Sequence, residues 1–274
     1  MESFNYDDAV EELKTFRQTN ERQSERVCAL GAKMMRDKLQ SKLGDEVWPF
    51  YEQVCIAAMD TGDKDLTNYC IQQLQARFGE SSLRFRRLLG MKHEASGRLE
   101  EAQKVYDSIL AEDETNMLTS KRQIALLKTR NKIPDMIKAL TKYLDTYYDD
   151  AEAWLELCDA YLNQYEYDQA AFCCEELLLL QPNNHLIYLK YAEILYTVHR
   201  YDLALKHYCK VLDLCPDYTR ALYGLHLTSS KLLNDTSSPH ASDLHALATE
   251  RLLHIYSQQP HQPIVQDYLA QPTA

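Results

Sequence analysis

The chain has 274 residues, and its composition already excludes several fold classes. It contains only 7 Gly and 8 Pro, well below the average usage of roughly 7% and 5%. Sandwiches, barrels and phosphate-binding loops need more of these residues for their turns. A hydrophobic content of 45% is still ample for a core. These numbers predict an all-α protein.

The charge and the termini limit the possible surroundings of the protein. A formal net charge of −11 gives no overall positive field for nucleic acid or anionic lipid. The N-terminal stretch is acidic and lacks the apolar run of a secretory signal, and no segment approaches the ~18 apolar residues of a membrane span. The 8 cysteines include no CxxC pair. We therefore expect a soluble intracellular protein with reduced thiols.

A spacing of 34 residues organises the sequence. Pro182 and Pro216 are separated by this period, and so are Ala170 and Ala204. It is the period of the tetratricopeptide repeat, a helix–turn–helix unit that stacks on its neighbours. The sequence thus predicts an all-α, right-handed superhelical solenoid of tetratricopeptide repeats.

The repeat frame predicts how the chain is divided. Its segments are N-terminal capping helices at 1–44, a divergent repeat at 45–82, a repeat at 83–116, a degenerate repeat at 117–150, repeats at 151–184 and 185–218, a partial repeat with an inserted loop at 219–257, and a flexible tail at 258–274. The loop is expected at 234–239, where polar residues end in Pro239.

Small and large residues alternate in the frame for a packing reason. Small residues let the two helices of a repeat approach, large ones fill the space between them, and proline ends the second helix. The residues assigned to this packing role are Gly90, Ala102, Trp154, Cys158, Tyr161, Ala170, Pro182, Ala192, Ala204, Tyr208 and Pro216.

Candidate catalytic and metal sites are weak. Cys173 and Cys174 are adjacent and point ~100° apart on a helix, and Cys174 takes a packing position. His207 and Cys209 lie on different helix faces. The histidines at 240, 245 and 254 are interpreted as solvated. We therefore predict no catalytic residue, no metal ligand, no cofactor and no enzymatic activity.

A binding surface is the stronger hypothesis, because solenoids present a long concave face that the first helix of each repeat lines. The predicted groove is basic toward its N-terminal half and acidic, with apolar patches, toward its C-terminal half. The apolar residues are Leu155, Leu186 and Leu189. The partner-binding candidates are Arg84, Arg87, Lys121, Arg122, Glu152, Glu156, Asp159, Glu193 and Tyr196. Ordinary solvated charge is an equally weighted interpretation of this pattern.

Several stretches carry a resemblance that goes beyond the generic repeat positions. They are 42–48 (KLGDEVW), 51–54 (YEQV), 153–154 (AW), 167–173 (YDQAAFC), 175–177 (EEL) and 182–185 (PNNH). Over roughly residues 5–230 the chain resembles the subunit 2 family of the endoplasmic reticulum membrane protein complex, also called tetratricopeptide repeat protein 35. After Ser229 the match fades.

The resemblance implies a non-catalytic scaffold, held peripherally on the cytoplasmic face of the endoplasmic reticulum. The complex inserts tail-anchored and multi-pass membrane proteins without nucleotide energy. The implied partners are the membrane-embedded subunits 3 and 5 and a soluble partner of the subunit 8 or 9 type, with no nucleic acid and only indirect membrane association.

Two other classes remain open. The chain could be a cytosolic tetratricopeptide adaptor or co-chaperone that binds a different peptide, or an RNA-processing helical-repeat protein, which the negative charge disfavours. A clamp for a peptide carboxylate is also disfavoured. Such a clamp uses an asparagine at position 9 of the repeat. In successive repeats this position holds Met91, Ala125, Asp159 and Glu193, and none of them is asparagine.

Overall fold

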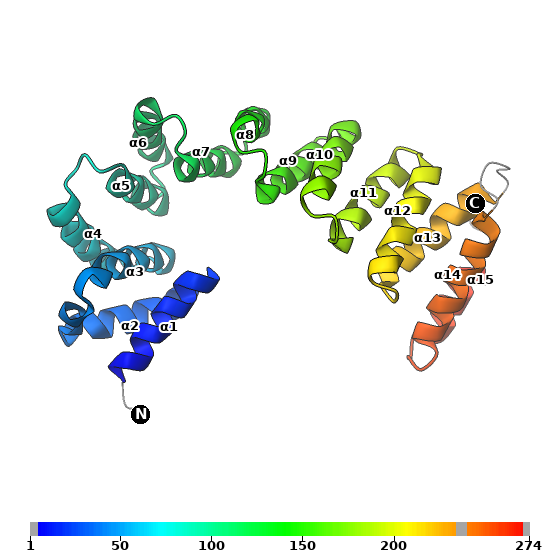
Figure 1. Ribbon diagram of the computed structural model, residues 1–274, viewed down its shortest axis with the longest axis horizontal. Coiled ribbons are helices and arrows are strands. Elements are labelled where there is room, and N and C mark those ends of the chain that lie inside the picture. The colour runs from blue at the N-terminus through cyan, green and yellow to red at the C-terminus, as the bar shows by residue number, and fades with distance from the viewer. Residues whose placement is uncertain (1–4, 234–239, 271–274) are drawn as a thin grey trace. The chain divides into compact units, whose positions relative to one another are not determined.

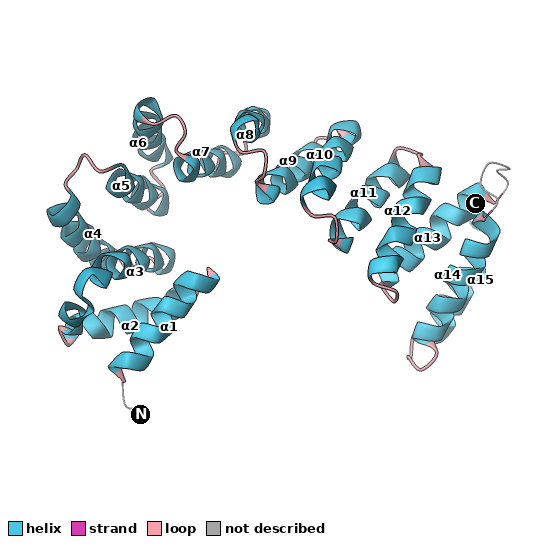
Figure 2. Ribbon diagram, in the orientation of Figure 1, coloured by secondary structure: helices cyan, strands magenta, loops and turns pink. Residues whose placement is uncertain are grey.

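A computed structural model describes residues 5–233 and 240–270. Over these ranges the chain forms fifteen α-helices, one 3₁₀ segment and no strand (Figure 2). The predicted all-α class is confirmed. The loop predicted at 234–239 lies outside the described residues.

The helices belong to two compact units, Met1–Lys132 and Ile133–Ala274 (Figure 1). The first unit contains α1 (Tyr6–Thr19), α2 (Ser24–Arg36), η1 (Leu39–Glu46), α3 (Val47–Thr61), α4 (Lys64–Phe78), α5 (Leu83–Ala95), α6 (Leu99–Glu112) and α7 (Met117–Thr129). The second contains α8 (Ile133–Thr146), α9 (Ala151–Asn163), α10 (Tyr167–Leu180), α11 (His185–Thr197), α12 (Tyr201–Leu214), α13 (Thr219–Leu232), α14 (Ala241–Tyr256) and α15 (Gln262–Ala270).

Polar side chains begin the first helix of four successive repeats. Ser82, Asn116, Asp150 and Asn184 are each 34 residues apart, and each accepts a hydrogen bond from a backbone amide of the helix that follows, at 3.5, 3.1, 3.2 and 3.1 Å. Such caps satisfy amides that the first turn leaves unpaired. Tyr218 takes the next position and makes no side-chain cap. The period therefore fixes where helices start as well as how they pack.

The turn between the two helices of a repeat follows the same period. Gly97, Asn131, Tyr165 and His199 have φ values of 73°, 56°, 61° and 61°. This left-handed conformation costs most residues roughly 1–2 kcal/mol, and only glycine adopts it freely. The repeat geometry imposes it even where the sequence offers tyrosine or histidine.

The small residues of the frame lie where helices touch. Ala102, Ala170, Ala192, Ala204 and Cys158 are buried. A Cβ on Gly90 of α5 would stand 2.2 Å from the Tyr106 ring of α6. The face where a first and a second helix pack on each other, which we call the seam, therefore leaves little space beside these small residues.

The other packing candidates divide by exposure. Tyr208 is buried, and Trp154 and Tyr161 are half-buried. Pro182 and Pro216 are exposed, two residues beyond the ends of α10 and α12. Both prolines therefore terminate helices and contribute little to the core.

The tail predicted as flexible over 258–274 needs correction, because it contains α15. Val265 and Leu269, one helical turn apart, are buried there and join a cluster with Leu222 and Leu252. Pro263 is compatible with this helix because it lies in the first turn, where no amide hydrogen bond is lost.

Candidate partner-binding site

All nine groove candidates lie on the first helices of repeats. Arg84 and Arg87 are on α5, and Lys121 and Arg122 are on α7. The remaining five are Glu152, Glu156 and Asp159 on α9, with Glu193 and Tyr196 on α11. Arg84, Glu152 and Asp159 are exposed and the others are half-buried.

In the first unit, the three arginine candidates pair with acids on the preceding first helix. Arg84 forms an ion pair with Glu52 of α3, and Arg87 approaches the other oxygen of the same carboxylate at 3.4 Å. Arg122 on α7 lies 3.4 Å from Glu94 on α5. Each of these arginines is thus matched by a carboxylate one repeat earlier.

The second unit repeats this arrangement. Lys190 on α11 pairs with Asp159 on α9. Arg220 on α13 binds Glu193 on α11 through two nitrogens, at 2.5 and 2.8 Å. In both units the acid comes from the earlier first helix and the base from the later one.

We call these residues the paired-charge face: Glu52, Arg84, Arg87, Glu94 and Arg122 in the first unit, and Asp159, Lys190, Glu193 and Arg220 in the second. The expected contrast between a basic and an acidic half needs correction. Carboxylates neutralise the arginines of α5 and α7, and bases neutralise Asp159 and Glu193. The face is mixed in charge because each acid faces a base.

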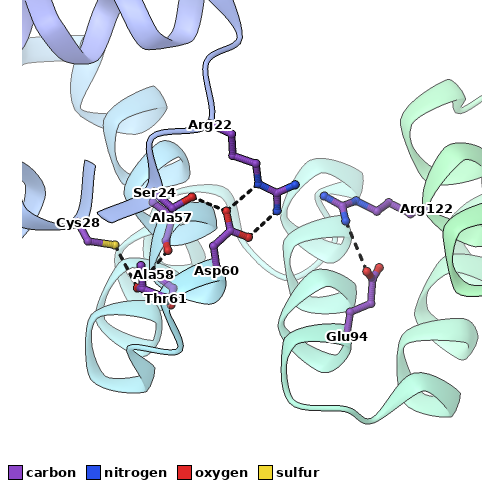
Figure 3. A network of polar contacts seen from close by, with 9 residues as sticks. All are labelled: Arg22, Ser24, Cys28, Ala57, Ala58, Asp60, Thr61, Glu94 and Arg122. Carbon is purple, nitrogen blue, oxygen red and sulfur yellow. Dashed lines mark hydrogen bonds and ion pairs between the residues drawn. The ribbon is translucent and has the colours of Figure 1, made fainter. Parts of the chain in front are cut away.

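A hollow of about 520 Å³ lies beside this face in the first unit. Asp60 at its edge accepts hydrogen bonds from Arg22, at 2.8 and 2.5 Å, and from Ser24 at 2.6 Å (Figure 3). The bonds from the Arg22 guanidinium hold the pKa of Asp60 below its usual range. Arg84 and Arg122 also line the hollow. It presents fixed charges of both signs to a visiting segment.

Glu94 connects the paired-charge face to the interior. One of its oxygens accepts a hydrogen bond from the hydroxyl of Tyr106, which is fully buried, and the other faces Arg122. Burial and this bond raise the pKa of Tyr106. The same ring packs on Gly90, so Tyr106 contacts both the seam and Glu94 of the paired-charge face.

The apolar candidates differ from one another. Leu155 is 40% exposed and Leu186 is 51% exposed, so both can meet a partner. Leu189 is buried in the core, which corrects its assignment to the surface. Tyr196 is half-buried and packs edge-on against Tyr201, with ring centroids 5.3 Å apart.

Sequence reasoning missed a buried histidine. His226 on α13 is 1% exposed, and its ring lies 4.2 Å from that of His245 on α14. His245 is half-buried, so its interpretation as solvated needs correction. The clue was available, because His226 takes the frame position that Cys158 and Ala192 fill with small side chains.

The described residues contain neither a metal-binding cluster nor a membrane-spanning helix. No group of three or more His, Cys, Asp or Glu side chains among them could hold a metal ion. None of their helices combines the length and the apolar character needed to cross a membrane.

Comparison with known proteins decides the family. Residues 81–210 match the family described as the EMC2 TPR-like repeat domain. The ER membrane protein complex subunit 2-B of Xenopus laevis is 40% identical over 240 residues, which cover 86% of this chain and 79% of the relative. This chain belongs to the ER membrane protein complex subunit 2 family.

Two further relatives are less similar to this chain. The Dictyostelium discoideum ER membrane protein complex subunit 2 is 31% identical over 247 residues, covering 85% of this chain and 77% of the relative. The TPR repeat protein oca3 of Schizosaccharomyces pombe is 36% identical over 201 residues, which cover 70% of this chain and 71% of the relative. The matches to both proteins include most of the helices described above.

A solved structure supports the fold alone. The C-terminal part of a TPR repeat-containing protein from Cytophaga hutchinsonii superimposes with a TM-score of 0.60 at 16% identity, covering 93% of this chain and 98% of that one. The predicted tetratricopeptide architecture is confirmed, and the resemblance to the subunit 2 family with it.

Proposed function

We propose that this chain is a non-catalytic scaffold subunit of an endoplasmic reticulum membrane protein complex, held peripherally on the cytoplasmic face of the membrane. The observation that carries the proposal is the 40% identity to a complex subunit 2 over 86% of the chain. In this role it supports insertion of tail-anchored and multi-pass proteins by holding cytosolic parts of other subunits. Membrane-embedded subunits 3 and 5 and a soluble partner of the subunit 8 or 9 type are the proposed partners.

The paired-charge face suggests how such segments are held. Segments on the cytosolic side of membrane proteins are rich in lysine and arginine, and they can replace Lys190 at Asp159 or Arg220 at Glu193. Each exchange trades one exposed ion pair for another and gains little, since such pairs contribute roughly 0–1 kcal/mol. The net affinity must therefore come from apolar contacts beside them, for which Leu155 and Leu186 are exposed.

Charge reversal tests the contribution of the acidic side. The double variant Glu156→Lys/Asp159→Lys places repulsion where a basic segment is proposed to bind. We expect recovery of the membrane-embedded subunits with the tagged chain to fall several-fold at moderate salt. Affinity purification from detergent-solubilised microsomes, followed by mass spectrometry, measures it.

Two controls separate partner binding from internal pairing. Asp159→Lys/Lys190→Asp exchanges the partners of one ion pair while keeping them opposite in sign, so it tests the cost of disturbing that pair. Asp213→Lys reverses an exposed charge on α12, away from the first helices. If Glu156→Lys/Asp159→Lys recovers the same subunits as Asp213→Lys, the acidic side of the groove is not the contact.

The alternative, a cytosolic adaptor with a different peptide partner, predicts a different fractionation. An adaptor stays in the supernatant when microsomes are pelleted, whereas the proposed scaffold pellets with them. Recovery of subunits 3 and 5 with the pelleted chain supports the scaffold, and their absence from a chain that stays in the supernatant refutes it.

A further inference from the structure

A second hollow lies in the second unit, away from the paired-charge face. It measures about 480 Å³, and its walls come from α8, α9 and α10. The side chains that decide its character are Leu144, Asp145, Trp154, Leu157, Phe172 and Cys173. No residue of the paired-charge face lines it. Its size lies within the ~300–1,000 Å³ range of ligand-binding pockets.

The next repeat shows why this space is open. One period after Leu157 and Cys173 stand Tyr191 and His207. The His207 ring packs on Tyr191 with centroids 4.6 Å apart and on Tyr188 at 5.9 Å. Tyr188 is the counterpart of Trp154. The repeat at 185–218 thus puts two rings where the repeat at 151–184 has an aliphatic side chain and a thiol.

Apolar side chains make up much of the hollow, although Thr141, Tyr161 and Gln169 also line it. Phe172 is 53% exposed and stands edge-on to Trp154, with centroids 6.1 Å apart. The indole nitrogen of Trp154 already donates a hydrogen bond to the Tyr148 carbonyl at 2.8 Å. Its N–H therefore does not need an acceptor from a ligand. Burial raises the pKa of the Cys173 thiol to about 12, which keeps it neutral. A large apolar side chain fits this surface.

The rim has the opposite character. Asp145 on α8 and Asp168 on α10 bring a carboxylate to each side. The Asp168 side chain is 80% exposed and forms a long, exposed ion pair with Arg200, whose nearest guanidinium nitrogen is 3.7 Å away. Exposed pairs of this kind contribute roughly 0–1 kcal/mol, so a cation from a bound segment can replace Arg200 at Asp168. Two carboxylates around an apolar floor favour a cationic neighbour of the inserted side chain and disfavour fatty acids and anionic lipids.

We infer that this hollow is a docking site for a peptide segment in which a large apolar side chain is flanked by lysine or arginine. The apolar side chain enters against Trp154 and Phe172, and the flanking cations meet Asp145 and Asp168. The inference does not depend on membership of a particular complex, because it concerns a different surface from the paired-charge face.

Trp154 provides a direct readout, since the chain has only 2 Trp. In the full chain carrying Trp48→Phe, Trp154 is the single indole. The probes are two blocked peptides without tryptophan, Gly-Lys-Leu-Phe-Lys-Gly and Gly-Glu-Leu-Phe-Glu-Gly. We expect the lysine peptide to change Trp154 emission saturably, with at least tenfold tighter binding than the glutamate peptide. No saturable change at millimolar peptide, or equal affinity for the two peptides, overturns the inference.

Two variants test the geometry, with calorimetry as the readout. Leu157→Tyr/Cys173→His fills the hollow with the residues that the next repeat already accommodates, and should weaken lysine-peptide binding at least tenfold. Asp145→Asn/Asp168→Asn alters exposed rim residues only, and should reduce the preference for the lysine peptide over the glutamate peptide to less than threefold.

Circular dichroism checks that each variant folds. Unchanged binding by the filled variant, or unchanged selectivity in the rim variant, contradicts the proposed site. If Trp154 emission instead changes on dilution without peptide, the occupant is a second copy of this chain and the inference fails.

Discussion

The seam and the paired-charge face both involve the first helices of the repeats but obey different rules. At the seam, Gly90, Ala170 and Ala204 leave no space for a larger side chain, so shape decides what is allowed. On the paired-charge face, partly exposed side chains such as Arg220 and Glu193 meet in pairs, and water can replace either partner. The comparison indicates that stability resides in the seam, whereas the face is free to be used for binding.

The strongest test of this contrast is Ala170→Arg. Ala170 is fully buried at the seam, so arginine both overpacks the site and buries an unpaired charge. We expect a loss of about 4 kcal/mol or more, which unfolds the second unit. Urea unfolding followed by circular dichroism measures it. A matched exposed change, Gln169→Arg on the same helix, should leave the midpoint nearly unchanged. A similar midpoint for both variants would show that the seam tolerates bulk.

A smaller effect is expected from Gly90→Ala. Alanine normally stabilises a helix interior by about 1 kcal/mol relative to glycine, but here its Cβ would meet the Tyr106 ring at 2.2 Å. The ring is fully buried and cannot move freely, so we predict a net loss of about 1–3 kcal/mol. If the Tyr106 ring is removed first, Gly90→Ala should no longer lower the stability. In a Tyr106→Leu background, Gly90→Ala should be neutral or stabilising, and a loss of the same size in both backgrounds would rule out this contact as the cause.

His226 makes the packing between α13 and α14 sensitive to pH. Burial, and then the neighbouring His245, lower the pKa of His226 below its usual value. The unfolded chain, with a histidine pKa of about 6.5, therefore binds the proton more readily than the folded one. Stability should fall as the pH drops below about 6.5, by at most ~1.4 kcal/mol per pH unit for this group.

The pH prediction is checked by urea unfolding between pH 7.5 and 5.5, with His226→Gln as the comparison. Glutamine keeps a polar group that can face the Thr249 hydroxyl, which lies 3.1 Å from the histidine ring nitrogen. The variant should show a shallower decline than the parent chain. The decline that remains comes from His93 and His207, whose pKa values burial also lowers. Parallel curves would mean that His226 has the same pKa in the folded and the unfolded chain, and would contradict the prediction.

The smallest effect should come from the paired-charge face. Arg220 is 68% exposed in its pair with Glu193, and exposed pairs contribute about 0.2–1 kcal/mol. Arg220→Ala should therefore cost no more than this, and a double-mutant cycle with Glu193→Ala isolates the pair. The coupling should weaken in high salt. A coupling above about 2 kcal/mol would place this face among the determinants of stability.

The period made the helices and the seam predictable, because small residues, caps and prolines recur every 34 residues. The ion pairs were not predictable from it. Glu52 and Arg84 are 32 residues apart, whereas Glu193 and Arg220 are 27 apart, because helix stagger and side-chain length shift each contact away from the repeat distance. The period could have revealed the second hollow, if Leu157 and Cys173 had been compared with their bulkier counterparts one repeat later.

The C-terminal helix escaped prediction for another reason. The sequence predicts a flexible tail over 258–274, yet Pro263 stands in the first turn of α15, where its fixed φ suits a helix. Only the tertiary contacts of Val265 and Leu269 stabilise so short a helix. The residues next to Val265 and Leu269 in the sequence do not indicate these tertiary contacts.

The position of Glu94 has a consequence for communication within the first unit. Its carboxylate links Arg122, on the surface, to Tyr106, in the interior. A ligand that draws Arg122 away leaves Glu94 with one partner fewer and changes the polarity that the Tyr106 hydroxyl experiences. Loss of the Arg122 contact would thereby alter the surroundings of Tyr106, a fully buried residue that no ligand can touch.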